Sequence, residues 1–240
     1  TASATPITVS DTLFTISNLQ SATAYQVYMR NVCSGENSAL SKPFVFNTNC
    51  VAVINAPYRQ TFDFVSTPGQ ACIELVSANT GNSYPYAEIN DETGFFVSGY
   101  SLETYASVNS PLFIVMPQLD IPVNETYIEF YYRNENTYDM YPDMVIGYMT
   151  DINDTTTFVA CNTLGRTINM TKILYAFNNA TATNGRVVLK VNKAPRYDGS
   201  KCAIDNVVMG SINTCNTVEN IALTNISNEE ATFKFDYYSI

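Results

Sequence analysis

The strongest constraint on the fold of this chain is the period of its apolar residues. Apolar and polar residues alternate over 25–30 (YQVYMR) and 127–132 (YIEFYY), a pattern typical of strands with one face on a core. Residues 143–149 (DMVIGYM) and 186–191 (RVVLKV) predict buried strands. The best helix candidate, 168–179 (INMTKILYAFNN), fits a strand equally well. We therefore predict an all-β protein.

Two absences in the composition limit the chemistry of the chain. Its 240 residues include no histidine and no tryptophan. Without histidine, a Ser-His-Asp triad, a Cys-His pair and a His-ligated zinc site are excluded. The net charge of −10, from 12 Lys+Arg and 22 Asp+Glu, argues against nucleic acid and anionic membranes as partners. The longest apolar run, 112–117 (LFIVMP), is far shorter than the ~20 residues of a membrane span, so no membrane insertion is expected.

The strand pattern divides the chain into three zones. The first, 1–48, has expected strands at 13–17, 24–32 and 43–47. The second, 49–211, holds most of the strands. The third, 212–240, adds strands near 218–223 and 231–237. Neither end zone is long enough to close a core of its own.

The two end zones carry a first family resemblance. Leu19, Thr23 and Tyr25 form a Leu-x-x-x-Thr-x-Tyr run that precedes Cys33 and 44–48 (FVFNT). This resembles the second half of a fibronectin type III domain, in which the hydroxyl of that tyrosine bonds nearby backbone. The segments 215–223 (CNTVENIAL) and 230–235 (EATFKF) look like the first two strands of another such domain.

The central zone carries a second resemblance, distributed over short blocks in a distinctive order. The blocks are 49–50 (NC), 56–64 (APYRQTFDF), 71–73 (ACI), 110–113 (SPLF), 119–121 (LDI), 128–132 (IEFYY), 145–151 (VIGYMTD), 154–158 (DTTTF) and 203–207 (AIDNV). The series resembles the MAM-like jelly-roll domains of secreted Bacteroidetes proteins. Those domains are related to the cleaved-adhesin domains of gingipain-type proteases and commonly alternate with fibronectin type III repeats.

Together the resemblances imply a domain plan and a class of function. The plan is the C-terminal half of a fibronectin type III domain at 1–48, a jelly-roll β-sandwich at 49–211, and the first strands of a further immunoglobulin-like sandwich at 212–240. We expect a non-catalytic adhesion segment of a larger bacterial protein, extracellular or on the cell surface. Its partner would be a host or cell-surface protein or a glycan. The alternatives are a carbohydrate-binding accessory module of a secreted protease or glycosidase, and a passive stalk.

None of the six cysteines forms a CxxC pair, so we expect disulfides, with buried free thiols as the alternative. In a fibronectin type III sandwich, a strand of roughly 17–27 Å would separate Cys33 from Cys50. That distance exceeds the ~7 Å between Cα atoms that a disulfide tolerates. The resemblance thus implies two bridges inside the jelly roll, Cys50–Cys72 and Cys161–Cys202.

The remaining cysteines, Cys33 and Cys215, are expected to pair outside their own segments. The resemblance implies that Cys33 pairs with a cysteine before Thr1, and Cys215 with one beyond Ile240. Such partners would make this chain a window cut from a tandem array. Two copies joined head to tail, with Cys33 facing Cys215, are the alternative.

The resemblance also implies a metal site. The related jelly rolls often hold a structural Ca²⁺ at positions that Asp63, Asp205 and Asn206 occupy in this sequence. Carboxylate and amide oxygens suit Ca²⁺, which needs no histidine. The alternative is that Asp205 and Asn206 cap a strand or turn.

Two other groups of residues are candidates for binding or catalysis. Loop carboxylates at 135–143 and 151–154 offer possible acid–base pairs, but solvated loop acids explain them better. Aromatic residues near expected loops can stack on sugars or anchor a protein, or simply pack in strands. Tyr138 and Tyr141 are the expected exposed pair, and the others are Tyr84, Tyr86, Phe95, Phe96, Tyr100, Tyr131 and Tyr132.

Overall fold

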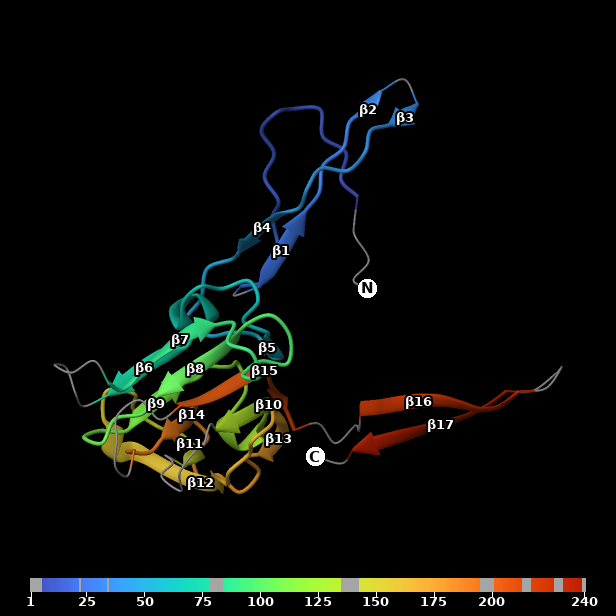
Figure 1. The fold of residues 1–240 in the computed structure, drawn as a ribbon. Helices are drawn as coiled ribbons and strands as arrows, with labels where there is room; N and C mark the ends of the chain where they lie inside the picture. Colours follow the sequence, from blue (N-terminus) through green and yellow to red (C-terminus); the bar gives the residue numbers. More distant parts are fainter. Residues whose placement is uncertain are drawn as a thin grey trace.

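The computed structural model confirms that the protein is all-β (Figure 1). It describes residues 6–21, 23–33, 35–77, 84–134, 143–194, 201–212, 217–226 and 231–238. Its helical elements are short 3₁₀ turns, and no helix in these ranges has the length and apolar character to cross a membrane. Residues 168–179, the best candidate for a helix, instead contain strand β13, Thr171–Ala176.

Two antiparallel sheets form the body of the molecule. The larger has six strands in the order β13-β10-β15-β8-β7, with β5 also paired to β15. The smaller has five strands in the order β12-β11-β14-β9-β6. The bounds of the larger sheet are β13 as above, β10 Thr126–Asn134, β15 Lys201–Ser211, β8 Ser101–Tyr105, β7 Tyr86–Asn90 and β5 Tyr58–Gln60. Those of the smaller are β12 Phe158–Leu164, β11 Met144–Met149, β14 Arg186–Val191, β9 Leu112–Val115 and β6 Glu74–Ser77.

The main core lies between the two sheets. Strand β10 shows how it forms, because its burial alternates strictly along nine residues. Ile128, Phe130 and Tyr132 point inward and are fully buried, whereas the residues between them are only partly buried. Burying such side chains contributes about 1.5–3 kcal/mol each, so the period-2 pattern fixes which face of the strand turns inward.

A second, smaller core covers the outer face of the five-stranded sheet. Phe113, Val115, Met149 and Val188 are buried there, with the ring of Phe158 packed against them. Gly147 is required beneath this ring, since an added Cβ would lie 2.6 Å from it. Strands β11 and β14 are therefore buried on both faces, which explains why their sequences are apolar without interruption.

One predicted disulfide is present. Cys50 and Cys72 are bonded, with their Cα atoms 5.6 Å apart. The bond joins the chain that enters the sandwich to the end of the 3₁₀ turn η1, Pro68–Ala71. Thr67 caps this turn by accepting a hydrogen bond from the Gln70 N–H, and Cys72 closes it in the left-handed conformation.

The predicted Cys161–Cys202 disulfide is wrong, because both thiols are free. Cys161 lies on β12, the edge strand of the five-stranded sheet, whereas Cys202 lies on β15 within the six-stranded sheet. Cys202 is fully buried, with its Sγ 3.0 Å from Thr104 Oγ1, and burial raises its pKa to about 12. Cys161 is half-buried, and burial also raises its pKa. Both thiols serve as small core groups.

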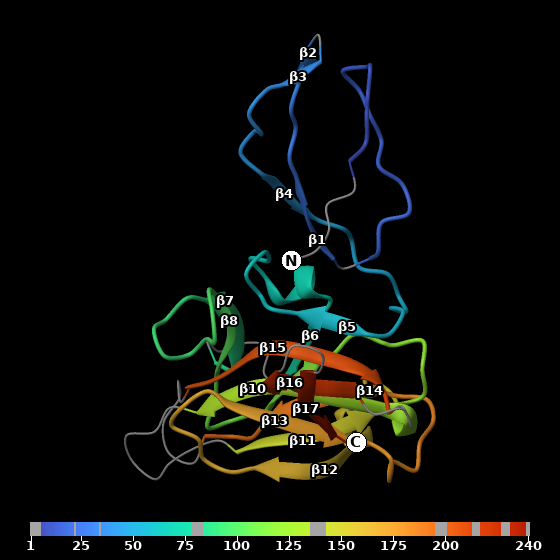
Figure 2. The same cartoon turned by 90° about the vertical axis from the view of Figure 1, so that its right-hand side faces the viewer.

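The N-terminal strands stand above the sandwich (Figure 2). They are β1 Ala24–Val27 paired with β4 Phe44–Asn47, and β2 Val32–Cys33 paired with β3 Glu36–Asn37. The tyrosine predicted to bond backbone does so, because Tyr25 Oη accepts from the Gln20 N–H at 2.8 Å. The strand expected at 13–17 does not form, since no strand pairs with it and Leu13 is 85% exposed. Cys33 is free and exposed.

The chain ends in an antiparallel hairpin of β16, Thr217–Ile226, and β17, Ala231–Tyr238. Both predicted C-terminal strands are thus present, longer than expected. Cys215 falls outside the described residues. The assignment of both ends to fibronectin type III domains, and the boundaries at 48 and 212, stay predictions.

Candidate functional site

A loop between β7 and β8 lies on the outer face of the six-stranded sheet. This strap, residues 91–100, is bonded to the strands below it at several points. Its Phe95 is 2% exposed, with the Arg133 Cζ 4.2 Å and the Lys201 Nζ 4.7 Å from the ring centre. Arg133 also donates to the Gly94 carbonyl, and Lys201 pairs with Glu92. The strap therefore buries polar residues that would otherwise lie on an open sheet face.

The strap brings together two residues predicted to bind a metal. Asp63 follows β5, whereas Asp205 lies in the middle of β15. The Val97 N–H donates to Asp205 Oδ2 at 2.7 Å, and the Tyr100 N–H donates to Asp63 Oδ1 at 3.1 Å. Gly99 has a φ of +72°, and a Cβ there would collide with Asp63. Both carboxylates thus hold the same short piece of chain.

Asn206, the third residue predicted to bind a metal, acts on Asp205 through its backbone. It has a φ of +51° and sits where the register between β10 and β15 shifts. This bulge aims Asp205 at the strap, and the Asn206 N–H donates to Asp205 Oδ1 at 2.6 Å. The predicted alternative, in which Asp205 and Asn206 cap a strand or turn, is wrong, because both residues lie inside β15, at a bulge.

The electrostatics of the carboxylate pair are unfavourable without a cation. Burial, with a smaller contribution from the charge of Asp63, raises the pKa of the Asp205 carboxyl to about 6, against backbone N–H donors that lower it. In the described ranges, the Lys and Arg ion pairs involve Glu side chains and not these two aspartates. The pair thus combines a fully buried carboxyl, Asp205, with a half-buried one, Asp63.

The oxygen atoms around Asp63 and Asp205 supply part of what a hard cation needs, which is about 6–8 oxygen ligands for Ca²⁺. Nowhere in the described part of the chain do three or more Cys, Asp or Glu side chains gather as a metal would require. Ser101, on the neighbouring strand, is fully buried, and its Oγ has no hydrogen-bond partner among the described residues. Carboxylate and hydroxyl oxygens are donors that Ca²⁺ accepts, and an ion here would need backbone carbonyls or water to complete its shell.

A tyrosine ladder, Tyr84, Tyr86 and Tyr105, lies on the same sheet at its β7 edge. Tyr86 stacks on Tyr105 with ring centres 4.5 Å apart, and Tyr84 follows at 5.4 Å. All three are half-buried. Tyr84 and Tyr86 were among the aromatic candidates, whereas Tyr105 was missed because its own stretch indicates only an ordinary strand.

Glu103 connects the ladder to the strap. It is fully buried, and its Oε2 accepts from Tyr105 Oη at 3.0 Å and from Asn90 Nδ2 at 3.3 Å. Lys201 lies 3.1 Å from the same oxygen. Burial and the Glu103 carboxylate raise the pKa of Tyr105, so this ring stays uncharged at any physiological pH. The edge therefore offers aromatic rings backed by a fixed network of polar groups.

The other predicted candidates divide into three groups. Tyr138 and Tyr141 lie outside the described residues, as do the acids at 135 and 139. Asp151 and Asp154 are not paired for catalysis: Asp154 caps the 3₁₀ turn η3, Thr155–Thr157, and Asp151 accepts from the Asn153 N–H at 2.9 Å. Tyr132 is fully buried in the main core.

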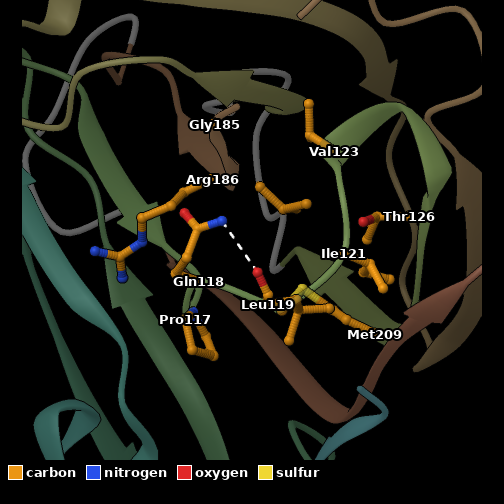
Figure 3. Close-up of a pocket in the computed structure, with 10 residues that line it drawn as sticks. Pro117, Gln118, Leu119, Ile121, Val123, Thr126, Gly185, Arg186 and Met209 are labelled. Carbon is orange, nitrogen blue, oxygen red and sulfur yellow. Dashed lines mark hydrogen bonds between the residues drawn. The ribbon is translucent and has the colours of Figure 1, made fainter. Parts of the chain in front are cut away.

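A small pocket is lined by residues 117–126 together with Gly185, Arg186, Val187 and Met209 (Figure 3). Its empty volume is about 210 Å³, below the 300–1,000 Å³ that ligand pockets usually need. Its walls include Ile121, Val123 and Met209, together with Arg186 and Gln118, whose Nε2 donates to the Leu119 carbonyl. The Arg186 side chain is already hydrogen-bonded within the protein, because its Nε donates to the Met116 carbonyl at 2.7 Å. The pocket is therefore smaller than a usual ligand site, and it carries no functional assignment.

Some solved structures resemble this chain in fold, at low sequence identity. Neither the protein-family models nor the curated proteins match. The K1 cleaved adhesin domain of Lys-gingipain from Porphyromonas gingivalis W83 is 12% identical at a TM-score of 0.48, covering 65% of this chain and 98% of that one. The CBM22-1 xylan-binding domain of Paenibacillus barcinonensis Xyn10C is 12% identical at 0.40, covering 65% and 94%. The Endo-D glycoside hydrolase domain of Streptococcus pneumoniae R6 is 13% identical at 0.46, covering 78% and 33%.

Proposed function

We propose that this chain is a non-catalytic binding segment of a larger bacterial protein that is secreted or displayed on the cell surface. The observation that carries the proposal is the tyrosine ladder at the β7 edge, anchored by Glu103 and Lys201. Half-buried tyrosines held in place by packing contribute contact area at low entropic cost, and tyrosine is enriched at interfaces. The network behind the rings holds this surface rigid before a partner arrives.

The partner we favour is a protein on a host or cell surface, because flat aromatic edges suit protein contacts. A glycan is the second candidate, since the exposed Glu88 lies on the same strand as Tyr86 and supplies a hydrogen-bonding group on that strand. Tyr138 and Tyr141 remain proposed contributors to either kind of contact. The acidic net charge disfavours nucleic acid and anionic lipid.

Glycan arrays and a cell-surface binding assay with the full chain test this function. Tyr86→Ala should weaken binding by at least about tenfold, or about 1.4 kcal/mol. Tyr28→Ala is the matched control, because Tyr28 is a 47% exposed tyrosine outside the ladder. Glycan binding that depends on Tyr86 would favour the carbohydrate module over the protein adhesin. Unchanged binding in Tyr86→Ala would refute the ladder as the site, and no binding to any surface would favour a passive stalk.

We also propose a structural Ca²⁺ held by Asp63 and Asp205, with Asn206 positioning Asp205. The ion would neutralise the buried carboxylate of Asp205 and the half-buried one of Asp63, and so fix the strap to the sheet. Supporting this are the shared strap contacts of both aspartates and the raised pKa of Asp205. Thermal unfolding with added Ca²⁺ and with a chelator is the test. We expect Ca²⁺ to raise the melting temperature of the native chain but not of Asp63→Asn, and equal temperatures in both conditions would refute the site.

A further inference from the structure

Three polar side chains on the outer face of the six-stranded sheet converge on one oxygen atom. Glu103 lies on β8, with Asn90 on β7 to one side of it and Lys201 on β15 to the other. Asn90 Nδ2 donates to Glu103 Oε2 at 3.3 Å, and Lys201 Nζ lies 3.1 Å from the same oxygen. A carboxamide and a primary amine, the two groups from which an isopeptide bond forms, are therefore held against a single carboxylate.

The contact is shielded from water. Glu103 is fully buried and Lys201 is 8% exposed. The ring centre of Phe95, on the strap, lies 4.7 Å from Lys201 Nζ, and that of Tyr105 lies 5.1 Å from it. Glu103 Oε1 is buried and has no hydrogen-bond partner among the described residues. Lysine and glutamate are rarely buried this deeply, and an unsatisfied buried oxygen is costly, so packing alone does not account for the cluster.

The carboxamide of Asn90 is oriented for attack. Its Nδ2 donates to Glu103, and its Oδ1 accepts from the Asp91 N–H at 2.8 Å. These two contacts determine which end of the amide is oxygen and which is nitrogen. A donor on Oδ1 stabilises the negative charge that develops there when a nucleophile adds to Cγ. The nitrogen that has to leave thus faces the one group that can protonate it.

Lys201 has to lose a proton before it can act as a nucleophile. Burial lowers the pKa of Lys201, but the carboxylates of Glu92 and Glu103 together raise it by more, so the resting side chain is an ammonium. Glu103 can accept the proton directly, since its Oε2 touches Nζ. The transfer turns a buried ion pair into a neutral amine and a neutral acid, which relieves the desolvation cost of the two charges.

We propose that Lys201 Nζ and Asn90 Cγ join in an intramolecular isopeptide bond, with Glu103 as the general acid and base. The amine lone pair attacks Cγ, and the π electrons of the carbonyl move onto Oδ1. Glu103 takes a proton from the attached nitrogen and gives one to Nδ2, the Cγ–Nδ2 bond breaks, and ammonia leaves. One lysine ammonium and one carboxamide thus become one secondary amide and one ammonium ion, so no oxidant or other reactant is needed.

The bond would join β7 to β15 across β8. It is a modification of the chain by itself, with no external substrate, and it goes beyond the proposed binding function. Tyr86 lies on β7, so the bond would also fix the strand that carries part of the tyrosine ladder. Its formation does not depend on what the ladder binds.

Intact-mass spectrometry of the full chain tests the bond. The native chain should be lighter than its sequence mass by one ammonia, about 17 Da, besides the hydrogens lost in the Cys50–Cys72 bond. Tandem mass spectrometry of a protease digest should find residues 90 and 201 in one branched peptide. Both signatures should persist after reduction and denaturation, because an amide bond survives them.

Three variants assign the roles. Lys201→Arg keeps the positive charge but has no nucleophilic amine, and Glu103→Gln keeps the shape of the side chain but cannot transfer the proton. Each of these two variants should show its full sequence mass. Lys42→Arg is the matched control, because Lys42 is an exposed lysine outside the cluster, and it should lose the ammonia as the native chain does.

Several results would overturn the proposal. One is a native chain at its full sequence mass. Another is an ammonia loss without a branched peptide, because a succinimide at Asn90 and Asp91 gives the same loss. A loss that persists in Lys201→Arg or in Glu103→Gln would also contradict it. Thermal unfolding shows whether these two variants fold, and if either does not, the mass and the peptides of the native chain decide the question by themselves.

Discussion

The central sandwich and the N-terminal unit of strands β1 to β4 are built from the same alternating pattern but differ in what covers their apolar residues. Phe130 on β10 is fully buried between two sheets, whereas Phe44 on β4 is 66% exposed beside a single strand. The comparison teaches that alternation specifies a strand and its apolar face, but not whether the chain supplies the opposing layer. Among the described residues, Phe130 belongs to the main core cluster, whereas Phe44 belongs to none.

Replacing each of these two phenylalanines by alanine should give the largest difference in stability loss between the two regions. Phe130→Ala leaves a cavity in a closed core and should lower the free energy of unfolding by about 3–5 kcal/mol. Phe44→Ala should lower it by less than about 0.5 kcal/mol. Urea denaturation measures both. Equal losses would show that Phe44 is packed as closely as Phe130.

Removing the Cys50–Cys72 bond should weaken the entrance to the sandwich. The bond closes a loop with a sequence separation of 22, and the chain-entropy model gives roughly 3 kcal/mol for a loop of that size. The double Cys→Ser variant should therefore lose about that much in urea denaturation. Cys33→Ser is the control, because Cys33 is free and exposed, and should change nothing. A stable double variant would mean that the entering segment is fixed by packing alone.

The buried carboxylate of Asp205 predicts a pH effect confined to the centre. Its pKa is about 6 in the folded chain against about 3.9 when unfolded, so between these values only the folded state binds the proton. With Ca²⁺ chelated, the stability of the native chain relative to Asp205→Asn should rise by about 1.4 kcal/mol per unit as pH falls from 6 to 4. The added stability is complete below the unfolded pKa and is lost as pH rises through 6. A flat difference would contradict the buried charge.

The smallest expected effect is local to the N-terminal unit. Tyr25→Phe removes the acceptor of the Gln20 N–H and should cost about 1 kcal/mol or less. Amide exchange at Gln20 should quicken while exchange in β10 stays the same. Tyr28→Phe loses only a bond to the Gln26 side chain and provides the control. A change in β10 would show that the unit and the sandwich unfold together.

The sequence was informative where a residue's role is local. Alternation predicted the all-β class and β1, and the Leu-x-x-x-Thr-x-Tyr run predicted the bond that Tyr25 makes. Proximity of Asp63 and Asp205 followed from the family resemblance. The strand expected at 13–17 failed because alternation cannot supply a pairing partner. Cys161–Cys202 failed because the pairing ignored which sheet each strand joins.

The strap shows why the rest could not be predicted. Residues 91–100 have the composition of an ordinary loop, and their coverage of Asp205 and Glu103 depends on tertiary contacts. The Phe95 ring contacts Arg133 and Lys201, which are distant from it in sequence. No local sequence pattern predicts these contacts. Likewise, Tyr105 joins the ladder only because β7 and β8 pair in one particular register.

Hydrogen exchange of the chain tests the contrast between the central sandwich and the N-terminal unit most directly. Amides in β10, β11, β14 and β15 should exchange only through global unfolding. Those in β1 and β4 should exchange at least roughly a hundredfold faster, because these strands contribute to neither core cluster of the described residues. Equal protection of β1, β4 and the core strands would contradict the account, since it would mean that the β1–β4 pair is covered as well as the central sandwich.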